Sequence, residues 1–152
     1  MRRLMTLALA AAASSPVAAQ PATSIALTCD AGAAVAVGDA PNLHGHWDFL
    51  MVPRGSASFG LLTIGFVGAA YGGSLAPVRT APVVLRTITL TGNSISMVVA
   101  AREGDVLFDG AVSAKGDLMC GTVTYFNGEK FPMVAQKRPS TYQSPPQAER
   151  AR

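Results

Sequence analysis

Three side chains near the start of the β-prone part of the sequence could bind a metal ion. His44 and His46 are two residues apart, so both project to one side of an extended chain, and Asp48 is the only obvious further ligand nearby. A protein zinc site needs a third and usually a fourth ligand. Because this set is incomplete, we assign the histidines to a loop and a strand edge, and metal binding is the less favoured hypothesis.

The sequence offers little for acid–base or nucleophilic catalysis. Asp105 and Asp109 share one face of a predicted strand, but strand geometry separates them by about 13 Å, too far for joint work on one bond. The serines lie in no Gly-x-Ser-x-Gly elbow, and no phosphate-binding glycine loop or dinucleotide motif is present. We therefore predict no catalytic residue and no cofactor, and expect that the chain is not an enzyme.

Cys29 and Cys120 are the two cysteines of the chain. An even pair in an exported protein indicates a disulfide first, and neither cysteine has the Cys-x-x-Cys spacing or nearby histidine of a reactive thiol. The bridge would close a loop of about ninety residues and stabilise the fold by about 4–5 kcal/mol in the chain-entropy model. We predict a Cys29–Cys120 disulfide that ties the N-terminal segment to a strand near the C-terminus.

Export is predicted by the first residues of the chain. Arg2 and Arg3 form a positive start, residues 4–13 are a short apolar run, and small residues precede Gln20. This is the pattern of a secretory signal peptide, and the apolar run is too short to cross a bilayer as a helix. The sequence predicts a signal peptide over 1–19, cleavage after Ala19, and a periplasmic or secreted protein. Lipidation of Cys29 is disfavoured, because Thr28 stands where a small residue is required.

The charge of the chain argues against nucleic acid as a partner. The chain has 12 Lys and Arg against nine Asp and Glu, and two of the basic residues are Arg2 and Arg3, so ten remain after cleavage. The mature chain is close to neutral and has no block of like charge, whereas nucleic-acid binding needs a basic face. No later segment is long and apolar enough to span a membrane as a helix.

From Gly45 onward, short β-prone runs alternate with turn residues every eight to twelve positions, which is typical of a barrel or sandwich. Asn127-Gly128 is a strong hairpin signal, and tight turns elsewhere predict antiparallel neighbours. Eight strands joined in this way must close or leave two edges exposed. We predict an all-β, eight-stranded up-and-down barrel over 43–138, a leader at 20–42 and a disordered tail at 139–152. The expected strands cover 46–52, 59–67, 71–76, 84–90, 94–101, 105–112, 118–126 and 130–137.

Gly45-His46-Trp47 at the opening of the first strand resembles the start of the calycin superfamily, which includes lipocalins, fatty-acid-binding proteins and avidins. In that family the Trp closes one end of the barrel and an Arg near the end of the last strand packs across it. The resemblance implies that Gly45, Trp47 and Arg138 close the barrel, with Arg138 a better match than Lys137. Residues 108–138 also resemble small lipocalin-like domains of proteobacterial exported proteins.

The resemblance implies two functions of different classes. The first is a non-enzymatic exported barrel that binds a small apolar ligand or a protein partner, with the barrel mouth as the ligand site. The alternative is an inhibitor or accessory subunit of a periplasmic hydrolase or protease, acting through the mobile residues before Cys29. A carrier requires an internal cavity, whereas an inhibitor is expected to have a filled barrel.

Overall fold

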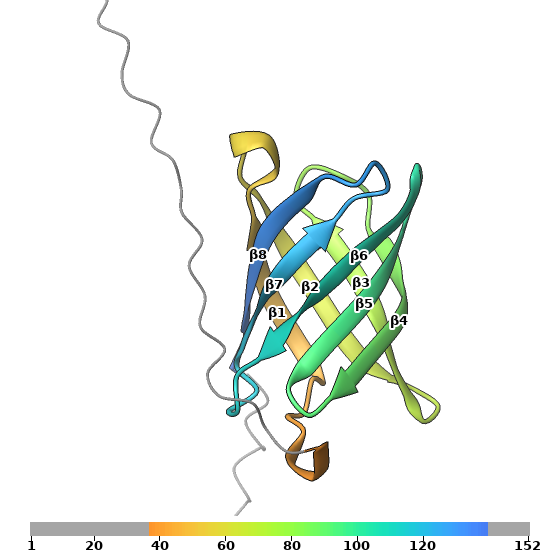
Figure 1. The fold of residues 1–152 in the computed structure, drawn as a ribbon. Coiled ribbons are helices and arrows are strands. Elements are labelled where there is room, and N and C mark those ends of the chain that lie inside the picture. The colour runs from red at the N-terminus through yellow and green to blue at the C-terminus, as the bar shows by residue number, and fades with distance from the viewer. Residues whose placement is uncertain (1–36, 140–152) are drawn as a thin grey trace, which may run out of the picture.

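The structure is a computed structural model that describes residues 37–139. The predicted signal peptide, most of the leader, Cys29 and almost all of the predicted tail lie outside these residues. Eight antiparallel strands close into one barrel in which β1 pairs with both β2 and β8 (Figure 1). The strands are β1 (Gly45–Met51), β2 (Ser58–Val67), β3 (Ala70–Pro77), β4 (Val83–Thr91), β5 (Ser94–Ala101), β6 (Gly104–Val112), β7 (Leu118–Thr124) and β8 (Lys130–Lys137).

Every strand pairs with its neighbours in sequence, so the predicted up-and-down barrel is confirmed. Short 3₁₀ turns precede β1 (η1, Val37–Asp39) and follow it (η2, Pro53–Gly55). The predicted bounds are those found for β5 and β8 and differ by no more than two residues elsewhere. No helix in this part of the chain is long and apolar enough to cross a membrane.

Strand alternation places one set of apolar side chains inside the barrel. On β6, Phe108 and Val112 are buried, whereas Asp105, Leu107 and Asp109 face outward, as the alternation in the sequence predicts. The inward-facing side chains of the eight strands together form the interior. Its buried members include Trp47, Phe49, Met51, Leu62, Ile64, Leu85, Ile88, Ile95, Met97, Val99, Phe108, Val112, Met119, Val123, Met133 and Ala135.

Two glycines allow β6 and β7 to approach closely. Gly110 lies opposite Gly121 in the ladder. A Cβ on Gly110 would lie 2.3 Å from the Cys120 carbonyl oxygen, and one on Gly121 would lie 2.2 Å from that of Asp109. Contacts this short do not occur in folded proteins, so the local curvature of the wall depends on both glycines.

Candidate functional site

The two ends of the barrel are built differently. At one end, which we call the closed end, the chain enters β1 and the β2–β3, β4–β5 and β6–β7 turns gather. At the other end, which we call the mouth, the longer β1–β2, β3–β4 and β7–β8 connections and the short β5–β6 turn meet (Figure 1). This follows from the up-and-down order, because alternate connections lie at the same end.

The closed end is sealed by Trp47 and Leu43, both fully buried. The Trp47 indole Nε1 donates a hydrogen bond of 3.0 Å to the Leu43 carbonyl oxygen. The Tyr71 hydroxyl accepts a bond of 3.3 Å from the Leu43 backbone N–H. The apolar side chains are therefore buried while the polar groups beside them keep their hydrogen bonds. The chain before β1 covers the interior at this end.

Lys137, and not Arg138, lies over the indole. The Lys137 ammonium is 5.4 Å from the centroid of the Trp47 ring and donates a bond of 2.7 Å to the Asn42 carbonyl oxygen. The expected stacking of Arg138 on Trp47 is wrong, because side chains alternate along β8. Lys137 is the direct cross-strand partner of Trp47 and shares its inward side, and Arg138 is one residue further on. Burial lowers the pKa of Lys137.

Arg138 closes the barrel from outside. Its backbone N–H donates to the His46 carbonyl oxygen at 2.8 Å, which extends the β1–β8 ladder. Its guanidinium binds Asp48 in a fork, with Nε 2.9 Å from Oδ2 and Nη2 2.7 Å from Oδ1. Hydrogen bonding from Arg138 lowers the pKa of the Asp48 carboxyl group.

Gly45 is required by the same arrangement. Its backbone has a φ of 137°, which strongly favours glycine, and a Cβ there would lie 3.0 Å from Cε of Lys137. The three residues that the resemblance assigned to closure thus lie at the closed end, with Lys137 in the position expected of Arg138. The contribution of Leu43 was not predicted.

The candidate metal ligands are not brought together. His44 stacks on Phe66, His46 Nδ1 is 3.1 Å from the Thr63 hydroxyl, and Asp48 binds Arg138. Across residues 37–139, no three His, Cys, Asp or Glu side chains gather into a group that could hold a metal ion. Asp105 pairs with Arg86 at 3.0 Å on the outer wall.

Cys120 is buried on β7, and no free cysteine occurs in the described part of the chain. Cys29 lies outside that part. The Cys29–Cys120 bridge therefore stays a prediction.

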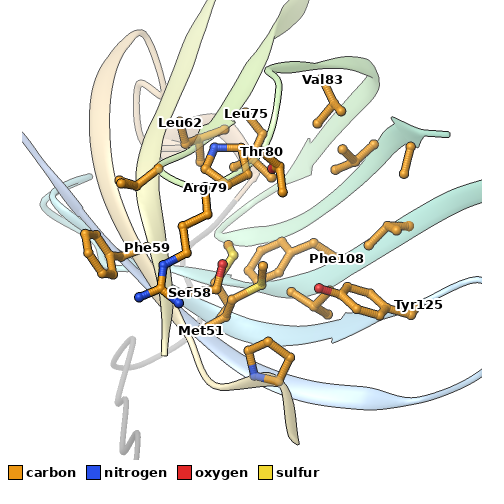
Figure 2. A pocket seen from close by; sticks show the side chains of 18 of the residues that line it. Met51, Ser58, Phe59, Leu62, Leu75, Arg79, Thr80, Val83, Phe108 and Tyr125 are labelled. Atoms are coloured by element: carbon orange, nitrogen blue, oxygen red, sulfur yellow. The ribbon is translucent and has the colours of Figure 1, made fainter. Parts of the chain in front are cut away.

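A cavity of about 660 Å³ extends from the connections at the mouth into the barrel. Its deep walls are apolar, and Phe108 points into it from β6, opposite Leu62 and Leu75 (Figure 2). The inward side chains that line it are Met51, Leu62, Leu75, Val83, Leu85, Met97, Val99, Ala101, Val106, Phe108, Val123, Tyr125 and Met133. The volume lies within the range of small-molecule sites in proteins, about 300–1,000 Å³.

Polar groups line only the outer part of the cavity. They belong to the connections at the mouth, except for Ser58, which begins β2, and they include Ser56, Ser58, Arg79, Thr80, Arg102 and Glu103. Tyr125 also lines the cavity, and burial raises the pKa of its phenol. A molecule in the cavity would meet apolar walls inside and polar groups only where it reaches water.

An ion pair joins two of the mouth connections. Arg54 in η2 binds Glu129 in the β7–β8 connection, and the Asn127 amide donates a bond of 2.8 Å to the same carboxylate. Hydrogen bonding, first from Arg54 and then from Asn127, lowers the pKa of Glu129. The pair holds these connections against each other beside the opening.

The chain matches no protein-family model and no curated protein sequence. Its functional interpretation therefore depends on the barrel, its closed end and its cavity.

Proposed function

We propose that this barrel binds a small apolar molecule in its interior and takes it up through the mouth. The observation that supports the proposal is the cavity of about 660 Å³ with an apolar inner wall. The cavity opens at the mouth, and an apolar recess of this size with a few polar groups at its edge is typical of small-molecule sites in proteins.

The closed end supports a single route of access. Trp47 and Leu43 are fully buried there, and Lys137 covers the indole. A ligand therefore enters between the connections at the mouth, past Tyr125 and Arg79. We further propose that the chain belongs with the small lipocalin-like exported barrels that its Gly45-His46-Trp47 motif resembles, and that it is exported to the periplasm or secreted.

The inhibitor or accessory-subunit hypothesis has less support. It was expected to come with a filled barrel, so the cavity favours the ligand carrier over this alternative.

A fluorescent apolar probe tests the proposal. N-phenyl-1-naphthylamine should bind the purified protein at one molecule per chain, with a gain in emission as it leaves water. Leu75→Trp places a larger side chain inside the cavity and should weaken binding at least tenfold.

The matched control is Leu107→Trp, which makes the same change on the outer wall and should leave binding as in the wild type. Equal affinity in wild type and Leu75→Trp would show that the probe binds the surface, and the proposal would fail.

A further inference from the structure

Exposed apolar side chains are concentrated around the mouth. Of the seven large hydrophobic residues exposed in the described part of the chain, four lie at or next to the mouth end of a strand. We call these four the collar: Phe59 (50% exposed), Val78 (66%), Val84 (62%) and Phe126 (53%). Monomeric soluble proteins rarely gather apolar surface in this way unless something binds it.

The collar surrounds the opening and is not confined to one wall. Phe59 and Val78 are neighbours, since the Val78 N–H donates to the Phe59 carbonyl oxygen at 3.0 Å. On the other side, Phe126 lies against the β5–β6 turn, with its Cβ 3.0 Å from the position of a Cβ on Gly104. Figure 2 shows Phe59 and Arg79 on one side of the cavity and Tyr125 on the other. A partner that meets the whole collar must therefore face the mouth end-on.

The charges at the mouth are predominantly positive. Arg79 and Arg102 line the opening, and Lys130 begins β8 beside it. Among residues 37–139 these three cations have no carboxylate partner, whereas Arg54 binds Glu129 and Arg86 binds Asp105. Glu103 is the one carboxylate at the opening that no cation of this region binds. Exposed apolar side chains next to unpaired cations are the combination by which peripheral proteins bind anionic lipid.

We propose that the mouth docks on the surface of a lipid bilayer that contains anionic headgroups. The collar side chains enter the boundary between headgroups and acyl chains, and Arg79, Arg102 and Lys130 face the lipid phosphates. A mouth in this position would open the cavity to the bilayer, so that an apolar ligand could pass between them without crossing water. Docking itself does not depend on the cavity being occupied.

Flotation with vesicles tests the proposal, using phosphatidylcholine with or without phosphatidylglycerol. The chain should float with the phosphatidylglycerol vesicles and separate from them at high salt. Arg79→Gln with Arg102→Gln should lower the partition coefficient on these vesicles by about twenty-fivefold, since each basic residue near an anionic surface contributes about a factor of five. Phe59→Ser with Phe126→Ser should lower it by about tenfold.

The matched control lies at the opposite end of the barrel. Phe66→Ser with Val67→Ser removes apolar side chains that are at least as exposed, from the β2–β3 hairpin, and should leave flotation unchanged. The apolar run at residues 4–13 is common to all these variants, so differences among them report on the barrel. Flotation of the collar variants equal to that of the wild type would overturn the proposal and leave a protein partner as the occupant of the collar.

Orientation is tested separately. On phosphatidylglycerol vesicles the emission of Phe126→Trp should shift to the blue, and that of Phe66→Trp should not; the reverse result would also overturn the proposal. Binding of the apolar probe is also measured in the same variants without vesicles. This distinguishes a loss of membrane docking from a loss of ligand binding in the cavity.

Discussion

Replacement of Trp47 by phenylalanine should destabilise the barrel by about 1–4 kcal/mol. The indole is fully buried and its Nε1 is the donor to the Leu43 carbonyl oxygen at 3.0 Å. Phenylalanine cannot donate this bond, and a buried acceptor left unsatisfied costs about 1–3 kcal/mol. The space left by the smaller ring adds up to about 1 kcal/mol. Trp47→Ala, which leaves a larger void, should cost about 3–5 kcal/mol.

Urea unfolding followed by far-UV circular dichroism measures this change, since the substitution removes the only tryptophan of the chain. The control is Phe126→Leu at the mouth, where the ring is exposed and the expected change is below about 0.5 kcal/mol. Probe affinity should stay within about twofold in Trp47→Phe, because the closed end does not line the cavity. A loss of stability below about 0.5 kcal/mol would refute the idea that Trp47 and Leu43 together seal the closed end.

Three further predictions concern the closed end and the barrel wall. Lys137→Met should lower the free energy of unfolding by about 1 kcal/mol, because it removes the cation over Trp47 and the hydrogen bond to Asn42. Equal urea midpoints for the variant and the wild type would contradict this. Gly110→Ala should cost about 1–3 kcal/mol by collision with the Cys120 carbonyl oxygen, whereas Gly38→Ala, with open space around the new Cβ, should be neutral in the same assay. The pKa of Asp48 is lowered in the fold from an ordinary value of 3.8, so the stability that its pair with Arg138 contributes is complete above that pH and is lost as the pH falls through the folded pKa. Arg138→Gln should therefore flatten the dependence of stability on pH in this acid range, measured by circular dichroism. An unchanged slope would count against the pairing.

Much of the fold could be predicted because local signals agree with one another. Apolar alternation on β6 and β7 sets which side chains face inward, and tight turns such as Asn127-Gly128 require neighbouring strands to pair. Closure follows from the cost of two open edges. Each of these inferences needs only residues close together in sequence.

The partner of Trp47 could also have been found by counting along β8. Met133 and Ala135 are inward residues, so the next inward position is Lys137 and not Arg138. The family resemblance favoured arginine because of its residue type, whereas strand alternation decides which side chain reaches the indole. Leu43 was missed because nothing local marks a residue before the first strand as part of the core.

The cavity and the collar depend on long-range geometry. Whether inward side chains fill a barrel depends on the tilt and register of all eight strands together, which no single segment reveals. The position of Phe59 beside the mouth, together with Val84 and Phe126 from other walls, emerges only when alternate connections meet at one end.

Native mass spectrometry tests the central claim most directly, with wild type and Leu75→Trp purified in parallel from the periplasm, the location we propose. A barrel that carries a small molecule in its cavity predicts an adduct on the wild type that is released on denaturation, and a bare mass for Leu75→Trp. The same adduct on both proteins, or on neither, would contradict a ligand held inside the barrel.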